Sequence, residues 1–329
     1  MLLYQGIRLD DVYVNILKDL LEEGVDVSPR GMKTLEIPSP VTIITAKPNQ
    51  NMITIPERKA LLSFYFGEFI WMLKGSNELE HVAHYLKGWR RFTDDGKTLN
   101  GAYGKRIFDW NGINQFDEVY KKLKKDIHCR QAVISIYNPE KDLRPTKDVP
   151  CNDFLQFYVR NNKLCCTVYQ RSCDIISGLT YDMHMFGTFQ MLMAGRLGLE
   201  VGNYTHIANS LHLYERDFEM ASTIVNAYSK NDYITEYNIF SRNDYRLENY
   251  EEERKIIIET EEFFRIHALT MTKEEINIKL SKINNRAWKH ALALILCFNL
   301  RKVKRYKEAE EFYCLLSPEV YEMVTKRWK

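Results

Sequence analysis

Hydrophobic and polar positions along the first 215 residues recur with two periods, one typical of helices and one of strands. Phe186, Phe189 and Met193, for example, share one face of a helix. This reasoning predicts helices over 11–23, 58–73, 116–125 and 182–197. Runs rich in β-branched residues predict strands over 41–46, 132–137, 154–159 and 164–169, and an extended segment over 203–214. The pair Asn161-Asn162 predicts a hairpin turn between the last two strands. The mixture predicts an α+β fold.

The last third of the chain has a different character. All 15 glycines lie at or before Gly202, and helical patterns follow one another after about residue 250. Thr272 and Glu275 form a capping box ahead of one helix, and further helices are expected around Trp288 and over 306–316. Charges of both signs on these helices indicate solvated faces. We therefore predict a core domain over 1–249 and a helical C-terminal extension over 250–329.

Composition and charge exclude several classes of protein. The formal net charge is +2, which gives no electrostatic signature of a nucleic-acid partner. No apolar run reaches 18 residues and no signal peptide is visible, so we expect no membrane association and a cytoplasmic location. The seven cysteines lack paired spacing, which indicates reduced thiols, and no Cys/His set has the spacing of a metal site.

Residues 144–217 concentrate the candidate chemical groups. Cys151 follows a proline and is a candidate nucleophile, because a nearby guanidinium would favour its thiolate. A lone cysteine is more often an inert core residue. Arg171 and Ser172 end a predicted strand and suit phosphate recognition. His212 and Tyr214 share one face of an extended segment, because side chains alternate along a strand.

The segments VPCN (149–152), YQRSCD (169–174), GLTYD (178–182) and LHLY (211–214) resemble the thymidylate synthase family, which includes the pyrimidine nucleotide hydroxymethylases. The resemblance covers about 12–217 and does not extend past about residue 220. It implies a large mixed β-sheet packed with helices and a homodimer formed through the sheet. It also implies that the Cys151 thiolate adds to C6 of a pyrimidine nucleoside monophosphate. The nucleotide carbon C5 then attacks the methylene of 5,10-methylenetetrahydrofolate, the folate co-substrate.

The resemblance also assigns roles to individual residues. It implies phosphate binding by Arg30, Arg171 and Ser172, and by Arg130 reaching across the dimer. Gln131 replaces the second arginine of the family's usual pair, which should weaken phosphate binding. The resemblance implies that His212 and Tyr214 bind the sugar 3′-hydroxyl. Glu68 and Tyr103 would belong to a proton relay, and Asp174 and Trp89 would contact the folate. A packed tryptophan, a buried glutamate and a structural ion pair are the ordinary alternatives for such residues.

Asp182 stands where thymidylate synthases carry an asparagine. An asparagine amide donates to O4 of uracil and accepts from N3–H. Cytosine presents the opposite pattern, which a carboxylic acid can match, as can a carboxylate that faces N3-protonated cytosine. Such a difference discriminates strongly when the groups are buried. At this position the chain therefore resembles the deoxycytidylate hydroxymethylases. A helix N-cap is the alternative interpretation, because Asp182 is expected to open a helix.

Two further departures indicate altered chemistry at the transferred carbon. Asn152 replaces the family's usual histidine after the catalytic cysteine, and the chain ends in TKRWK without a counterpart of the family's closing C-terminal segment. A site open to water would favour addition of water to the exocyclic methylene. The sequence thus indicates a 5-hydroxymethyltransferase for dCMP or CMP that releases tetrahydrofolate. A thymidylate synthase that methylates dUMP and releases dihydrofolate, and a non-catalytic nucleotide-binding protein, are the alternatives.

Overall fold

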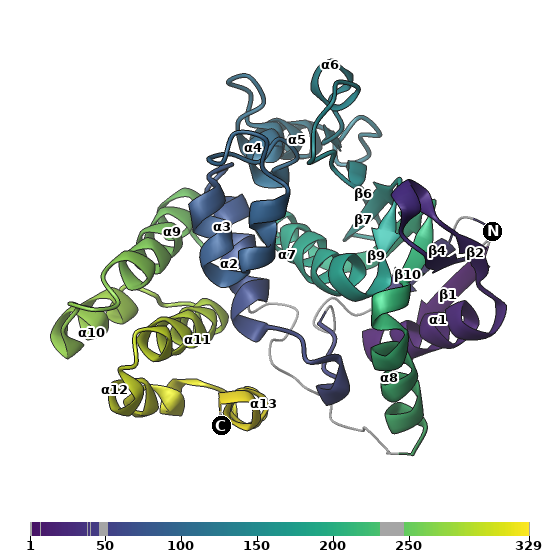
Figure 1. Ribbon diagram of the computed structural model, residues 1–329. Helices are drawn as coiled ribbons and strands as arrows, with labels where there is room; N and C mark the ends of the chain where they lie inside the picture. The colour runs from purple at the N-terminus through teal and green to yellow at the C-terminus, as the bar shows by residue number, and fades with distance from the viewer. Residues whose placement is uncertain are drawn as a thin grey trace. The chain divides into compact units, whose positions relative to one another are not determined.

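The computed structural model describes residues 2–6, 8–37, 39, 41–45, 52–230 and 247–328 (Figure 1). The chain forms two compact units. The first comprises residues 1–60, 116–143 and 150–238, and the second comprises residues 61–115, 144–149 and 239–329. Mixed sheets packed with helices confirm the α+β fold. In the described part of the chain, no helix combines the length and apolar character needed to cross a bilayer.

A six-stranded mixed sheet forms the centre of the first unit, in the order β1-β4-β9-β7-β6-β5. The β1/β4 and β7/β9 pairs are parallel and the other pairs are antiparallel. Asn161 and Asn162 join β6 to β7 with φ of 50° and 58°, which confirms the predicted hairpin. The strands are β1 Leu2–Gly6, β4 Val41–Thr45, β5 Val133–Ser135, β6 Asn152–Arg160, β7 Lys163–Gln170 and β9 Glu200–Ala208. Residue 46, the end of one predicted strand, lies outside the described residues.

A smaller four-stranded sheet in the same unit has the order β2-β3-β10-β8. Its strands are β2 Val25–Val27, β3 Thr34–Glu36, β8 Cys173–Asp174 and β10 Leu211–Tyr214. β8 and β10 pair in parallel, with His212 opposite Asp174. The sheet therefore places two of the predicted site residues side by side. The extended segment predicted over 203–214 is confirmed as β9 and β10.

The helices of the first unit include α7 (Thr180–Leu197), which packs against β7 and β9. Its first fifteen residues are all buried, as a helix covering a sheet requires. The other helices are α1 Leu9–Glu23, α5 Gln115–Lys125, α6 Pro139–Asp142 and α8 Phe218–Lys230. A π-helix, Ile175–Leu179, runs directly into α7, so this helix begins before the predicted residue 182.

The helix predicted over 58–73 is shorter than expected. A 3₁₀ turn, Pro56–Arg58, precedes it, and Lys59 then adopts φ of 51°, which interrupts the helical path. The α-helix itself, α2, spans Leu62–Leu73. Arg58 is buried and donates to the Ile176 carbonyl and to Thr180 Oγ1, so it anchors the π-helix ahead of α7.

Helices make up the second unit, and α11 (Arg286–Lys302) packs against α2, α9 and α12. The Trp288 ring stacks on Phe69 at 5.8 Å. The capping box of Thr272 and Glu275 is confirmed. The remaining helices are α3 Leu79–Tyr85, α4 Tyr103–Phe108, α9 Tyr250–Ile266, α10 Lys273–Ser281, α12 Tyr306–Glu311 and α13 Pro318–Trp328. The predicted helix over 306–316 is thus α12 followed by a 3₁₀ turn, Tyr313–Leu315. The domain boundary at residue 250 stays a prediction.

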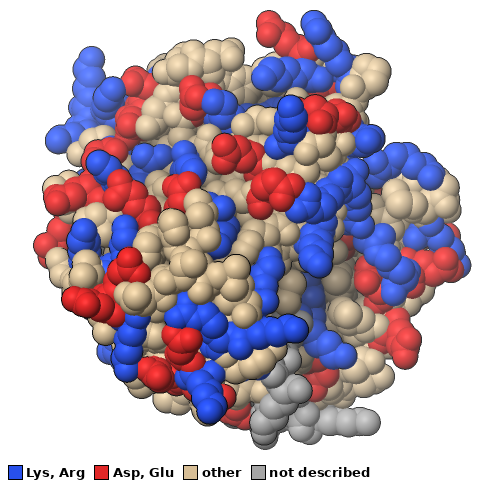
Figure 2. All heavy atoms as spheres, turned by 60° about the vertical axis from the view of Figure 1, so that its left-hand side comes forward, with Lys and Arg blue, Asp and Glu red and all other residues tan. Residues whose placement is uncertain are grey.

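Figure 2 shows one face of the molecule, over which acidic and basic side chains are interspersed. This distribution agrees with the near-zero net charge. Both signs of charge on one surface favour solubility over non-specific attraction to a polyanion.

Candidate active site

The buried face of the six-stranded sheet brings polar side chains together at the end of β7. Asn152 pairs with Gln170, and a bulge between Asn152 and Phe154 shifts the register there. The extra residue turns Asn152 to the same buried face as Gln170, because a bulge re-aims a side chain. The Asn152 side chain is fully buried, and neither of its polar atoms makes a hydrogen bond to another described residue. Donor and acceptor capacity is therefore left over at this point.

Asp182 lies in the first turn of α7 and faces this group. Only 8% of its surface is exposed, and Gln170 Nε2 donates to its Oδ2 at 2.5 Å. Burial raises the pKa of Asp182 to about 7, against the opposing effect of the Gln170 and Asn152 amides. The N-cap interpretation is wrong, since Leu179 occupies the cap position and the Asp182 side chain binds Gln170. A buried carboxyl that titrates near neutrality, with no ion pair to another described residue, is typical of a functional site.

Two residues that the sequence analysis did not identify, His206 and Tyr204, lie next to Gln170. The His206 Nε2 atom lies 2.7 Å from Gln170 Oε1, and the Tyr204 hydroxyl lies 3.1 Å from His206 Nδ1. All three side chains are buried, and burial lowers the pKa of His206 to about 3. Side chains alternate along β9, so Tyr204 and His206 lie on the same face, and this spacing is the signal in the sequence that could have identified them. Their partner in β7 depends on a parallel pairing of distant segments, which the sequence does not reveal.

Cys151 precedes β6 and is partly exposed. The Arg171 backbone N–H donates to the Cys151 carbonyl at 2.9 Å, and Arg171 Nε donates to the Pro150 carbonyl at 2.9 Å. The structure thus brings the predicted nucleophile and a predicted phosphate ligand together. All seven cysteines are free. Cys173 differs from Cys151, because complete burial raises its pKa well above the usual value and makes it inert.

His212 and Tyr214 lie on β10 with their rings 5.0 Å apart in an edge-on arrangement. The Arg216 guanidinium covers the Tyr214 ring at 4.1 Å and forms an ion pair with Asp174 Oδ2 at 3.4 Å. Asp174 Oδ1 accepts from the N–H groups of Ile176 and Ser177, so this residue caps the π-helix. One oxygen of Asp174 therefore accepts from backbone N–H groups, while the one described polar partner of Oδ2 is the exposed Arg216. Its role toward folate stays a prediction.

The other predicted phosphate ligands of the first unit are on its surface. Arg30 is exposed in a 3₁₀ turn, with φ of 55°. Arg130 and Gln131 are exposed before β5, and the Arg130 carbonyl accepts from Gln156 Nε2 at 2.8 Å. Among the described residues neither arginine forms an ion pair, so both guanidinium groups are available for an anion. Ser172 is half-buried beside Arg171.

Three predicted site residues belong to the second unit. Glu68 is buried within α2, every residue of which is buried. Tyr103 is the first residue of α4 and is half-buried. The Trp89 ring lies 6.1 Å from that of Trp71 and 5.7 Å from that of Phe92, in tilted arrangements. Aromatic packing is thus part of what Trp89 does, and the roles of all three toward ligands stay predictions.

Comparison with known proteins extends these observations. The sequence profile of the thymidylate synthase family matches residues 11–261, which runs past the resemblance at 12–217 and into α9. A deoxyuridylate hydroxymethyltransferase of Bacillus phage SP01 is 36% identical over 229 residues, covering 65% of this chain and 59% of that protein. A deoxyuridylate hydroxymethyltransferase of Pseudomonas phage M6 is 33% identical over 203 residues, covering 60% and 58%. The chain thus spans less than two thirds of the length of these relatives.

Proposed function

The chain belongs to the thymidylate synthase family, and on that premise we propose that it is a pyrimidine nucleotide 5-hydroxymethyltransferase. The observation that carries the proposal is the meeting of Cys151, Arg171, Asn152 and Asp182 at the end of β7 in a relative of two phage hydroxymethyltransferases. 5,10-Methylenetetrahydrofolate would supply the one-carbon unit. Asp174 Oδ2 suits the ring N–H donors of such a co-substrate, because Arg216 is its one polar partner within the described part of the chain.

In the proposed reaction Cys151 acts as the nucleophile. Its sulfur forms a bond to C6 of the pyrimidine, which makes C5 nucleophilic toward the one-carbon unit. C5 attacks the methylene carbon, and one of the two bonds between that carbon and folate nitrogen breaks. C5 then loses its hydrogen as a proton while the second carbon–nitrogen bond breaks, which releases tetrahydrofolate and leaves an exocyclic methylene on C5. Glu68 and Tyr103 are the proposed proton-handling residues. Water adds to the resulting exocyclic methylene, and release of Cys151 regenerates the ring. Nucleotide, methylenetetrahydrofolate and water thereby give the 5-hydroxymethyl nucleotide and tetrahydrofolate, with no change of oxidation state in the folate.

The proposed substrate is dCMP, with CMP as the ribose form. A neutral Asp182 donates from one oxygen and accepts at the other, which matches cytosine N3 and the 4-amino group. Its pKa of about 7 keeps the neutral form populated at physiological pH. Phosphate would be bound by Arg171, Ser172 and Arg30, and the sugar 3′-hydroxyl by His212 and Tyr214.

Hydroxymethylation of dUMP is the second candidate, and the names of the two phage relatives favour it. A neutral carboxyl group can also match uracil if its donor faces O4 and its acceptor faces N3–H. The order of donor and acceptor along the Asp182 carboxyl therefore separates the two candidates. Methylation of dUMP with release of dihydrofolate is a further outcome to be tested.

A homodimer is the proposed assembly. The outer face of the six-stranded sheet carries the exposed apolar side chains Val133 and Phe154, and Phe154 stacks on Tyr169 at 5.5 Å. Such a face suits a second copy of the sheet. Arg130 would then serve the partner's phosphate site. Mixing inactive Arg130→Ala and Cys151→Ser proteins should restore activity, because one hybrid site would be intact. No recovery after subunit exchange would contradict this arrangement.

The function is tested by tritium release from [5-³H]dCMP, [5-³H]CMP and [5-³H]dUMP with methylenetetrahydrofolate, while absorbance reports dihydrofolate. We expect release from a cytidine nucleotide without dihydrofolate, and none from the Cys151→Ser protein. Release from dUMP alone without dihydrofolate would establish the second candidate. Dihydrofolate formation would make the protein a thymidylate synthase. Absence of release from all three nucleotides would refute the proposed function.

A further inference from the structure

A line of three buried side chains ends on Asp182. We propose that Gln170, His206 and Tyr204 are positioning residues that fix which Asp182 oxygen donates and which accepts, and thereby set the preference between cytosine and uracil. The proposal rests on the proposed function, because it concerns the base that the same site recognises. It goes further in assigning specificity to three residues that need not touch the nucleotide.

The direction of the hydrogen bonds follows from the geometry. Gln170 Nε2 donates to Asp182 Oδ2, so the other end of the amide, Oε1, must accept from His206 Nε2–H at 2.7 Å. His206 is neutral, because burial lowers its pKa to about 3, and a neutral imidazole carries one proton. With that proton on Nε2, Nδ1 accepts from the Tyr204 hydroxyl at 3.1 Å. Each group in the line therefore donates to the next: Tyr204 to His206, His206 to Gln170, and Gln170 to Asp182.

The reverse direction is disfavoured at the Tyr204 end. It would require a protonated Asp182 Oδ2 that donates to Gln170 and a His206 Nδ1–H that donates to the Tyr204 oxygen. The Tyr204 hydroxyl hydrogen would then need another acceptor. Tyr204 is 1% exposed, and His206 is its one hydrogen-bond partner among the described residues. A buried donor left without an acceptor is costly, so the hydroxyl holds the whole line in one direction.

This direction determines the pattern that Asp182 presents to a base. Since Oδ2 accepts from Gln170, the proton of the neutral acid resides on Oδ1. Oδ1 is then the donor and Oδ2 the acceptor, and their order along the base edge is fixed. Cytosine and uracil present opposite orders, so a fixed order excludes one of them. If the line reversed, the proton would move to Oδ2 and the excluded base would lose its disadvantage.

The framework around the line is rigid enough to hold it. Tyr204 and His206 lie on β9, and Gln170 ends β7, which pairs with β9 in parallel. Val168 pairs with His206, and Gln170 pairs with Ala208, so these side chains emerge on the same face. Helix α7 covers that face and carries Asp182. A site supported by paired strands and a packed helix keeps hydrogen-bond geometry better than one built on loops.

The first test is the Tyr204→Phe variant, which removes only the hydroxyl that sets the direction. We expect the ratio of kcat/KM for dCMP to that for dUMP to move about 10-fold toward unity, because the two directions become closer in energy. Tyr85→Phe is the matched control, since it removes a buried, hydrogen-bonded phenol hydroxyl from the second unit. A ratio that is the same in both variants and in the wild type would overturn the proposal.

The second test observes the line directly, without any nucleotide. In ¹⁵N spectra the wild-type His206 should carry its proton on Nε2 at neutral pH, and the signal is assigned by its loss in His206→Gln. A proton on Nδ1, or on both nitrogens, would overturn the proposal. This result is independent of activity, so an enzyme inactive on all three nucleotides would refute the proposed function and still leave the line testable. If the wild type prefers dUMP, the ratio of kcat/KM for dCMP to that for dUMP is below one, and Tyr204→Phe should raise it toward one.

Discussion

Asp182 in the first unit and Glu261 in the second are both buried carboxyl groups, yet they titrate in opposite directions. Asp182 is 8% exposed and Glu261 is 0% exposed. The pKa of Asp182 rises to about 7, whereas that of Glu261 falls to about 2. Burial acts to raise both pKa values. The difference between them therefore comes from the groups that face each carboxyl.

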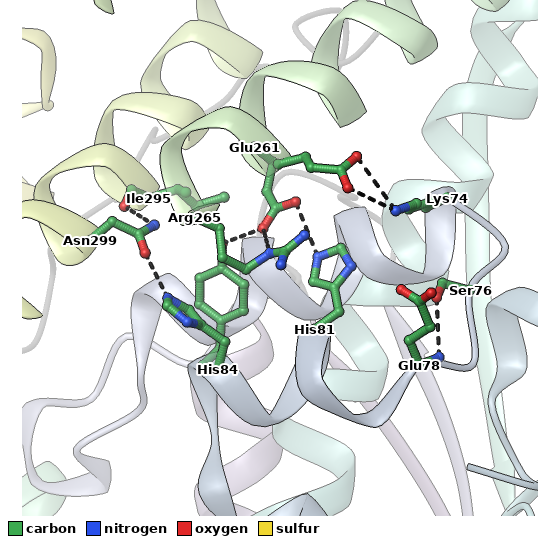
Figure 3. A network of polar contacts seen from close by, with 11 residues as sticks. Lys74, Ser76, Glu78, His81, His84, Glu261, Arg265, Ile295 and Asn299 are labelled. Atoms are coloured by element: carbon green, nitrogen blue, oxygen red, sulfur yellow. Dashed lines mark hydrogen bonds and ion pairs between the residues drawn. The ribbon is translucent and has the colours of Figure 1, made fainter. Parts of the chain in front are cut away.

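Glu261 lies among cations and donors, which Figure 3 shows in detail. Arg265 Nε donates to Glu261 Oε1 at 2.8 Å, and the Tyr85 hydroxyl donates to the same oxygen at 2.7 Å. His81 Nε2 lies 3.1 Å from Oε2. Together they outweigh burial and hold the pKa of Glu261 low. Among the described residues, the groups that lower the pKa of Asp182 are the neutral amides of Gln170 and Asn152, and they do not offset the cost of burying its charge.

The two networks teach that burial alone does not identify a functional carboxyl. Glu261 is on α9 and its partners His81 and Tyr85 are on α3, so its charge ties the two helices together. Nearby, His84 Nε2 lies 2.6 Å from Asn299 Oδ1, and this hydrogen bond between uncharged groups joins α3 to α11 (Figure 3). Asp182 forms no ion pair with another described residue, and its pKa is about 7. Burial of a carboxyl group whose charge the neighbouring amides do not offset fits a role in binding.

The largest expected effect is on base selection. Asp182→Asn should lower the ratio of kcat/KM for dCMP to that for dUMP by about 10,000-fold, because a carboxylate can accept at both oxygens from N3-protonated cytosine, whereas an amide always presents one donor and one acceptor. Steady-state tritium release with both nucleotides measures the ratio. Glu261→Gln serves as the control and should leave the ratio unchanged. An equal effect of the two variants would mean that Asp182 does not read the base.

The next largest effect is on the stability of the second unit. Glu261→Gln should lower the free energy of unfolding by about 3–5 kcal/mol, because Arg265, whose side chain is only 14% exposed, would lose its counter-charge. All five tryptophans lie in the second unit, so their fluorescence during urea unfolding reports it. The matched control is Glu262→Gln, which breaks a partly exposed pair with Lys74 and should cost under about 1 kcal/mol. Equal losses would contradict a buried network at Glu261.

The pH dependence of stability should separate the two carboxyls. The pKa of Asp182 is raised from 3.8 to about 7, so the folded state loses stability as pH rises from about 4 to 7, and this loss is complete above that range. Circular dichroism monitors unfolding at each pH. Between pH 4 and pH 8 the free energy of unfolding of Asp182→Asn should rise by on the order of 3 kcal/mol relative to that of the wild type. The Glu261 contribution is lost only as pH falls from 4.5 toward 2. A constant difference between Asp182→Asn and wild type across this range would contradict the raised pKa.

How much of this was predictable depends on the range of the interactions. The α+β class, the β6–β7 hairpin and the capping box at Thr272 follow from local sequence, because neighbouring residues determine them. The N-cap interpretation of Asp182 failed, because a π-helix held by the buried Arg58 starts the helical path earlier. The line through His206 depends on the parallel pairing of β7 with β9. Charges of both signs predicted solvated faces in the extension, yet Glu261 is fully buried against residues some 180 positions earlier.

The smallest effect compares two buried tyrosines. Tyr85→Phe removes a hydroxyl that donates to the ionised Glu261, whereas Tyr204→Phe removes one that donates to the neutral His206. Hydrogen bonds to charged groups contribute more, so we expect losses of about 2 kcal/mol for Tyr85→Phe and about 1 kcal/mol for Tyr204→Phe. Urea unfolding measures both, by fluorescence for the second unit and by circular dichroism for the first. A larger loss for Tyr204→Phe would mean that the line to Asp182 carries charge, and so that Asp182, like Glu261, is ionised in the folded protein at neutral pH.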